Sequence, residues 1–433
     1  MRSVGFLIVA SLIVVGCSAG TGAGREPGAA AKPAQGGAAA PTPVPINVSY
    51  QPALYWSLPY FLASEHGWWE QMGLRPNFST FPSGAPQVAA LASKSWDVGG
   101  MGSAPAVLGA TRYGLRTIGI TNDESAANAL MARGDQVALF ASNPAAIRGK
   151  QILLTTNSTG EYAVNACLSK WGLSQSDVQI VPLGQAEIIS AFSSGNGDLA
   201  GVWAPNIYTL EEKAGAKVLC SGRDAGAVVP GALVAREDFA REHPELVARY
   251  VAVYLHAQQW QRQHPEETLR AMEQFYQRGG VNISAPYFKV EVDTRPTFDL
   301  QAQLRILSRA AGGASEVDGW FTNVGRYLLS TGTIDRLPEP QQVITDEFMR
   351  RVYDDHQLRR FAEDGSSRFR WRFSTREAAW YGRLSPSCAS PYWPCAPRPP
   401  VPRRARRPLR RPRAPRPAPP PARLRRRPRR PPR

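Results

Sequence analysis

The chain has 433 residues and a formal net charge of +16, but the positive charge is not spread along it. The segment from residue 366 to the end holds 21 of the 51 Lys and Arg residues and one of the 35 Asp and Glu residues, which leaves 30 bases against 34 acids before it. A mildly acidic body without a basic stripe argues against nucleic-acid binding, and the length favours two domains over one.

The N-terminus has the pattern of an export signal. Arg2 precedes an apolar run over residues 4–15, which suits a signal peptide and falls short of the roughly 20 residues that span a bilayer. The run ends in Val14-Val15-Gly16-Cys17, which resembles the bacterial lipobox. We therefore expect a signal peptide over residues 1–16 and a lipid on Cys17, the alternative being an ordinary signal peptide that contains a cysteine.

The next segment, residues 17–43, consists mainly of Gly, Ala, Pro, Thr and Ser. Such a stretch has too few apolar side chains to offset the entropy of ordering it. The sequence predicts a flexible tether that holds a folded domain near a membrane surface, outside the cytoplasm.

The body alternates strand-like and helix-like segments. Strands are expected at 46–50, 74–81, 97–100, 117–121, 151–156, 178–181, 217–220 and 231–234, with helices at 60–72, 85–93 and 105–111 among them. After the last strand the chain turns helical, with segments at 244–262, 265–277, 298–311 and 317–330. Alternation of this kind predicts an α/β protein with parallel sheets, in which ligands bind beyond the carboxyl ends of the strands.

Six short motifs follow one another along the body. They are Pro-Tyr-Phe-Leu-Ala at 59–63 with Gly-Trp-Trp at 67–69, Phe-Pro-Ser-Gly-Ala at 81–85, Asp-Val-Gly at 97–99 with Ser-Ala-Pro at 103–105, Ile-Arg-Gly-Lys at 147–150, Thr-Asn-Ser-Thr at 156–159, and Asp-Leu-Ala-Gly-Val-Trp-Ala-Pro at 198–205. In this order they resemble the sulfonate, nitrate, taurine and thiamine-precursor family of periplasmic-type solute-binding proteins.

That resemblance implies a type 2 periplasmic-binding-protein fold, with two α/β lobes joined by two crossover strands and a ligand cleft between them. Lobe 1 is expected over residues 44–125 and 228–364, and lobe 2 over 126–227. The implied function is capture of a small anionic or zwitterionic solute, such as a sulfonate, taurine or nitrate, by a monomer that delivers it to an ABC-transporter permease. A thiamine-pyrimidine precursor as the ligand is the alternative.

A helix that begins after a strand at Ser158, Thr159 and Glu161 is the first candidate for the binding site. The unpaired N–H groups of a first helical turn and the helix dipole favour an anion there. Ser158 and Glu161 also fit a capping box, which is a purely local device. If Glu161 faces the cleft, its carboxylate indicates a ligand that carries an amine or another donor.

The resemblance supplies the remaining candidates. Ser103 before Pro105 has the pattern of a second helix start, and Ser83 with Gly84 forms a turn that either faces the cleft or is structural. Aromatic and polar side chains follow the first strand, and they either contact the ligand or pack the first loop. One more aromatic side chain, in lobe 2, is expected to line the cleft. These are Tyr50, Gln51, Tyr55, Trp56 and Trp203.

No cofactor, metal site or enzyme is expected. The five histidines include no metal-binding spacing, and Cys167 and Cys220 either form a disulfide or are two separate buried thiols. A pyrimidine synthase exists on the same fold, but it needs clustered cysteines and a histidine in the cleft, which this chain does not offer.

The last segment, residues 365–433, differs in character from the body. Residues 391–433 contain 16 Pro and 16 Arg, so they cannot form a core and are expected to be disordered. Two interpretations stay open: an electrostatic anchor on anionic lipid or polymer, or the product of a frameshift in a GC-rich gene.

Overall fold

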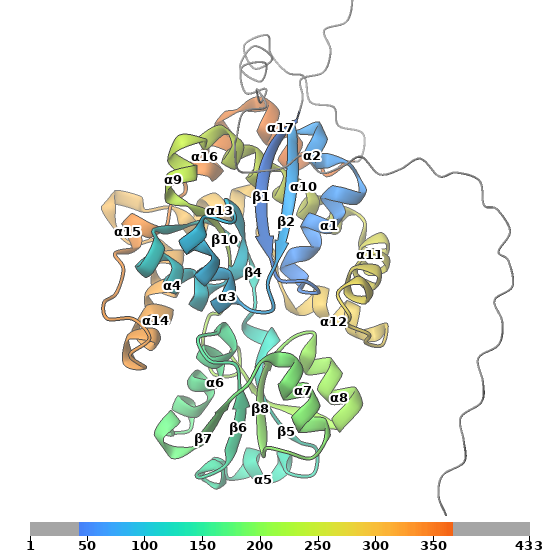
Figure 1. Ribbon diagram of the computed structural model, residues 1–433, viewed down its shortest axis with the longest axis vertical. Coiled ribbons are helices and arrows are strands. Elements are labelled where there is room, and N and C mark those ends of the chain that lie inside the picture. The colour runs from blue at the N-terminus through green and yellow to red at the C-terminus, as the bar shows by residue number, and fades with distance from the viewer. Residues whose placement is uncertain (1–42, 367–433) are drawn as a thin grey trace, which may run out of the picture. The chain divides into compact units, whose positions relative to one another are not determined.

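The computed structural model describes residues 43–366, so Cys17 and nearly all of the predicted tether and tail lie outside the described residues (Figure 1). Two five-stranded mixed sheets form the centres of two lobes. The sheet of lobe 1 has the order β2-β1-β3-β10-β4 and that of lobe 2 the order β7-β6-β8-β5-β9. The predicted fold class, two α/β lobes of the periplasmic-binding-protein type, is confirmed.

Lobe 1 is built from parallel strands with one antiparallel insertion. Its strands are β1 (Val44–Tyr50), β2 (Leu74–Thr80), β3 (Val98–Gly102), β4 (Leu115–Asp123) and β10 (Pro230–Arg236). β1 pairs in parallel with β2 and β3, whereas β10 runs antiparallel between β3 and β4. The strand that returns from lobe 2 thereby lies within the sheet of lobe 1.

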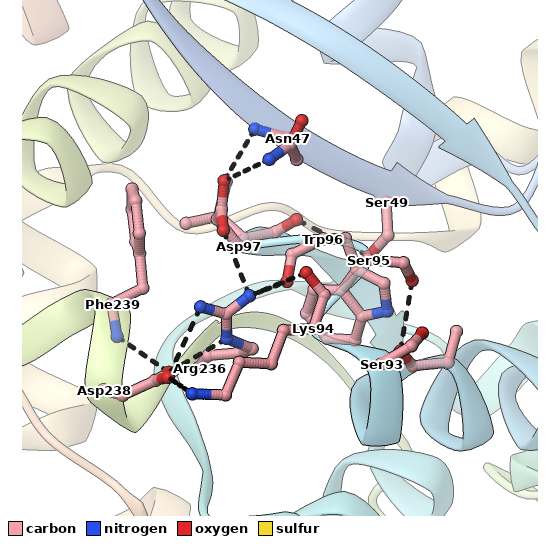
Figure 2. Close-up of polar contacts among 12 residues, drawn as sticks. Asn47, Ser49, Ser93, Lys94, Ser95, Trp96, Asp97, Arg236, Asp238 and Phe239 are labelled. Atoms are coloured by element: carbon pink, nitrogen blue, oxygen red, sulfur yellow. Dashed lines mark hydrogen bonds and ion pairs between the residues drawn. The ribbon is translucent and has the colours of Figure 1, made fainter. Parts of the chain in front are cut away.

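A polar network fixes β10 beside β3, as Figure 2 shows. Asp97 accepts hydrogen bonds from the backbone and side-chain nitrogens of Asn47, and its other oxygen lies 3.2 Å from Arg236. Arg236 also pairs with Asp238, which pairs in turn with Lys94. The cations lower the pKa of the Asp238 carboxyl against the opposing effect of burial, so the network holds its charged form.

Lobe 2 repeats the same topology on a smaller scale. Its strands are β5 (Asn128–Arg133), β6 (Gln151–Leu154), β7 (Gln179–Pro182), β8 (Leu199–Trp203) and β9 (Ala216–Ser221), and its helices are α5 (Val137–Ser142), α6 (Thr159–Lys170), α7 (Gln185–Ser193) and α8 (Asn206–Ala214). The chain passes between the sheets twice, from β4 to β5 and from β9 to β10.

The helical second half of the chain packs on lobe 1. Its helices are α9 (Glu237–Glu242), α10 (Pro244–Gln263), α11 (Pro265–Arg278), α12 (Pro286–Thr294), α13 (Leu300–Leu307), α14 (Glu316–Ser330), α15 (Pro340–Val343), α16 (Glu347–Asp354) and α17 (His356–Asp364). Most side chains of α10 are buried, and the ring of His256 stacks on Phe361 of α17 at 4.1 Å. A helix buried on nearly all sides belongs to a core, and α10 shares one hydrophobic core with the sheet of lobe 1.

The N-terminal helices of lobe 1 differ from the prediction in one respect. The helix expected over residues 60–72 is two helices, α1 (Leu58–Glu65) and α2 (Trp68–Gln71). Gly67 separates them in a left-handed conformation with φ of 69°, which glycine adopts without the steric cost that a Cβ brings. Two further helices, α3 (Gly84–Ala89) and α4 (Ser103–Tyr113), follow β2 and β3.

Cys167 and Cys220 form a disulfide, which decides between the two alternatives left open by the sequence. The bond joins α6 to β9 across 53 residues of chain. Closing a loop of that length in the unfolded state stabilises the fold by up to about 4 kcal/mol in the chain-entropy treatment. The bond therefore ties the anion-binding candidate helix to the sheet of lobe 2.

Candidate functional site

A cavity that opens to solvent, with about 440 Å³ of empty space when that opening is included, is lined by both lobes and by the first crossover. Lobe 1 and lobe 2 each contribute aromatic and small polar side chains, and the crossover contributes a carboxylate and an amide. The lining residues are Gln51, Leu54, Trp56, Gly84, Gly102, Pro105, Glu124, Asn128, Ser158, Thr159 and Trp203. Six of the sequence-predicted site residues are among them: Gln51, Trp56, Gly84, Ser158, Thr159 and Trp203.

Two helix N-termini meet at this cavity, one from each lobe. α6 begins at Thr159, and its N-cap Ser158 accepts a hydrogen bond from the Glu161 backbone nitrogen. α4 begins at Ser103, with Gly102 as its N-cap. The two ends approach so closely that a Cβ on Gly102 would overlap Oγ1 of Thr159. Because each N-terminus carries unpaired N–H groups and a partial positive charge, their convergence favours an anion over a cation at this part of the cavity.

Two tryptophans form aromatic walls of the cavity, and glycines make room for them. A Cβ on Gly160 would lie 3.1 Å from the Trp203 ring, and a Cβ on Gly100 would lie 2.7 Å from the Trp56 ring. Trp203 ends β8, where it lies opposite Asn128 of β5. The indole rings are therefore held by backbone that packs directly against them, which reduces the ordering that a ligand has to impose.

A carboxylate that sequence reasoning missed also lines the cavity. Glu124 lies between β4 and β5, and its side chain is 7% exposed. Oε1 accepts a hydrogen bond from Asn122 at 2.6 Å, and Oε2 lies 3.2 Å from Arg295. Burial raises the pKa of the Glu124 carboxyl, while Arg295 and Asn122 act in the opposite direction.

Arg295 is shared between two carboxylates. Its other terminal nitrogen lies 2.8 Å from Oε2 of Glu291, and both side chains are almost wholly buried. The Tyr276 hydroxyl donates to the same Glu291 oxygen. One guanidinium thus pairs with two carboxylates. The buried cluster of Glu124, Arg295 and Glu291 therefore carries a formal charge of −1 when both acids are ionised.

Four other predicted residues lie away from the cavity lining. Tyr50 packs in an aromatic group with Tyr60 and Phe78, at ring separations of 5.9 and 5.6 Å. The Tyr55 ring lies 5.6 Å from the guanidinium carbon of Arg295. Ser83 is the N-cap of α3 but makes no side-chain capping bond, and Ser103, the first residue of α4, is buried.

Glu161 is occupied by local and interlobe contacts and is not part of the lining. Its carboxylate accepts a hydrogen bond from the Asn157 backbone nitrogen at 2.8 Å, and it interacts with Tyr327 and Gln175. Burial raises the pKa of the Glu161 carboxyl against these contacts. The carboxylate that faces the cavity is therefore Glu124.

The lobes contact each other on both sides of the cavity. On one side Gln175 donates to the Tyr327 hydroxyl at 3.2 Å, and Thr333 donates to the side chain of Asn157 at 3.1 Å. On the other side Tyr287 of α12 donates to Glu211 of α8 at 3.0 Å. These contacts hold the cleft in a closed arrangement.

The described residues contain no group of three or more His, Cys, Asp or Glu side chains placed to hold a metal ion. Over residues 43–366 we also find no helix with the length and apolar character needed to cross a membrane.

Known proteins are similar to this chain in sequence and in fold. The chain is 27% identical over 307 residues to a protein of Brucella abortus described only as a binding protein, a match that covers 69% of this chain and 89% of the relative. It is 32% identical over 208 residues to the taurine-binding periplasmic protein of Escherichia coli, covering 47% and 63%. The crystal structure of the aliphatic sulphonate binding protein SsuA from Escherichia coli superposes with a TM-score of 0.57 at 19% identity, covering 70% of this chain and 92% of that one.

The fold is that of the two-lobed periplasmic binding proteins. Residues 56–268 match the family described as NMT1/THI5 like. The resemblance inferred from the six sequence motifs is confirmed.

Proposed function

We propose that this protein is the extracytoplasmic solute-binding subunit of an ABC importer and that it captures a small organic anion of the sulfonate type. The observation that carries the proposal is the convergence of the α4 and α6 N-termini, from different lobes, on one cavity. An anion bound there contacts both lobes at once, so it favours the closed arrangement over any open one.

The energetics of the site suit a transport protein. Each charge-assisted hydrogen bond to a buried anion contributes about 1.5–3 kcal/mol. The Thr159 hydroxyl and first-turn N–H groups supply such hydrogen bonds, and the indole faces of Trp56 and Trp203 add aromatic contact. The Ser158 hydroxyl already donates to the Thr155 carbonyl at 2.6 Å, so Ser158 takes part through its place at the start of α6. After the cost of association, three or four such contacts give micromolar dissociation constants, near 8 kcal/mol of binding free energy.

The relatives support this ligand class. The protein from Escherichia coli that shares 32% identity is named as taurine-binding, and taurine is an aminosulfonate. The likeness to the sulphonate-binding structure supports the fold that such a ligand uses. Since these relatives are binding proteins, we propose that this chain likewise catalyses nothing. None of its five histidines is among the cavity-lining residues.

We propose that residues 44–125 and 228–364 move as lobe 1 and residues 126–227 as lobe 2. The two crossovers between the sheets are the only covalent links between those ranges, so they are the natural hinge. The contacts from Gln175 to Tyr327 and from Tyr287 to Glu211 break when the lobes separate. The permease partner then recognises the closed form, which the bound solute stabilises together with these interlobe contacts.

We further propose that a lipid on Cys17 anchors the protein, as a monomer, to the outer face of a membrane. The lipobox-like Val14-Val15-Gly16-Cys17 sequence supports this. Replacing Cys17 by Ala should release the protein from the membrane fraction without changing its solute affinity. Unchanged partitioning of that variant would contradict the anchor.

A thermal-shift panel on the full chain tests the proposed function. Ligands that bind the native state raise the melting temperature. Taurine or propane-1-sulfonate at millimolar concentration should raise it, whereas a hydroxymethylpyrimidine should not. A shift with the pyrimidine alone would support the thiamine-precursor alternative, and no shift with any organosulfonate would overturn the proposal.

A further inference from the structure

The wall of the ligand cavity contains an acid whose charge is incompletely balanced. Glu124 lines the cavity, and its side chain is 7% exposed. The charged groups that act on it from the surrounding elements are Arg295, Glu291 and Asp123. Arg295 is the one cation among them, and it also pairs with Glu291 at 2.8 Å, whereas Asp123 has a cation of its own, Arg223, at 3.9 Å.

A buried net negative charge is costly unless a partner neutralises it. Tyr276 donates a hydrogen bond to Glu291, and Asn122 donates one to Glu124, but neither supplies a positive charge. Glu124, Arg295 and Glu291 together carry one excess negative charge when both acids are ionised, and a proton or a second cation would neutralise it. Of the three groups Glu124 alone is among the cavity-lining residues, so a cation that enters the cavity meets the cluster at Glu124.

The anion site and this acid lie on the same small cavity. Asn128 connects them: its Nδ2 donates to the Glu124 backbone carbonyl at 3.1 Å, and its Oδ1 lies 3.7 Å from the Cβ position of Gly160 in the first turn of α6. The first turn of α6 and Glu124 therefore border the same pocket, at a separation that one short ligand can bridge.

We propose that Glu124 is the specificity-determining residue for a zwitterionic ligand, a short aminosulfonate whose ammonium group it neutralises while the N-termini of α4 and α6 hold the sulfonate. This inference rests on the proposed function and narrows its ligand class. Specificity of this kind arises because a ligand without the ammonium leaves the excess negative charge of the Glu124, Arg295 and Glu291 cluster without a counter-charge in the same desolvated position.

The protonation state of Glu124 gives a second, independent test of the proposal. Burial raises the pKa of Glu124, and a bound ammonium lowers it again. Binding of an aminosulfonate should then release protons from the fraction of protein in which Glu124 is protonated. Affinity for that ligand should fall as the pH falls through the Glu124 pKa, whereas affinity for a simple alkanesulfonate should not.

Calorimetric titration of the full chain with two matched ligands tests the inference. Taurine and propane-1-sulfonate have nearly the same size and differ in an ammonium against a methyl group. The parent protein should bind taurine at least about tenfold more tightly. Equal affinities for the two ligands in the parent protein would overturn the inference while leaving the proposed function intact, and absence of binding by both would count against the function itself.

The Glu124→Gln variant completes the test. It should lose about tenfold or more in taurine affinity and keep or improve its affinity for propane-1-sulfonate, which reverses the preference. Glu273→Gln on the exposed face of α11 is the matched control and should change neither. If Glu124→Gln does not fold, the parent's ligand preference and its pH dependence still decide the question, because neither measurement requires a variant.

Discussion

Oε2 of Glu124 and a guanidinium nitrogen of Arg295 lie 3.2 Å apart in the interior, which joins the first crossover to the segment after α12. Arg295 also donates to the Ala204 carbonyl at 3.3 Å, next to the end of β8 in lobe 2. The ion pair therefore fixes the position of the ligand-facing Glu124 carboxylate, and Arg295 links elements of both lobes.

Replacing Arg295 by Met should destabilise the protein strongly. The change leaves Glu124 and Glu291 buried without their cation, and breaking a buried pair from one side costs about 3–5 kcal/mol. Urea denaturation should show this loss in the free energy of unfolding. Arg326→Met on the exposed face of α14 is the control, and an equal small effect for both would show that the buried cluster does not need its cation.

Replacing Trp203 by Ala should weaken ligand binding by more than about 1.4 kcal/mol, a tenfold change. The indole is a wall of the cavity and packs on Gly160. Trp203→Phe keeps an aromatic face and should recover part of the affinity. Calorimetry with taurine measures both, and an unchanged dissociation constant for Trp203→Ala would remove this wall from the site.

Replacing Tyr327 by Phe should weaken closure without touching the cavity. The change deletes the hydroxyl that accepts from Gln175 and lies beside Glu161. Since closed and bound forms are linked, the loss of one interlobe hydrogen bond, about 1 kcal/mol, should raise the dissociation constant about fivefold. Tyr113→Phe, at an exposed position, should have no effect. If Tyr327→Phe binds as tightly as the parent, the interlobe contacts do not set the affinity.

His256 should make stability depend on pH. Burial lowers its pKa from 6.5 to about 4, against the Phe361 carbonyl that its Nδ1 contacts at 2.6 Å. The unfolded chain therefore binds a proton that the folded chain does not, and stability present above pH 6.5 is lost as the pH falls toward 4. The loss is about 3 kcal/mol at 1.36 kcal/mol per pKa unit.

The measurement is the urea midpoint between pH 7 and 4 for the parent, His256→Gln and the exposed His356→Gln. The curve should flatten for His256→Gln alone. Three parallel curves would show that His256 does not drive the acid sensitivity.

Much of the fold could be predicted from the sequence because lobe 1 strands and long helices have strong local signals. α10 was expected at 244–262 and is found at Pro244–Gln263, since Pro244 begins it and apolar residues continue through it. β5 and β8 were not expected as strands, and they pair with each other although about 65 residues separate them in the chain. Such a strand is defined by non-local pairing, which local patterns do not reveal.

The sequence predicted those residues of the candidate site that depend on helix starts. It did not predict those that depend on long-range contacts. Ser158 and Thr159 have a capping pattern that identifies the start of α6. Glu124 has no motif around it, and its importance comes from Arg295, 171 positions later in the chain. The same limit explains Glu161, whose partner Tyr327 lies on a helix that the sequence does not place opposite α6.

A crystal structure of the full chain grown with taurine tests the central claim most directly. The account predicts the sulfonate oxygens within hydrogen-bond distance of Ser158, Thr159 and the first-turn nitrogens of α4 and α6, and the ammonium within 4 Å of a Glu124 oxygen, roughly the limit for an ion pair. Taurine bound outside this cavity, or held by one lobe only while the other stays apart, would contradict it.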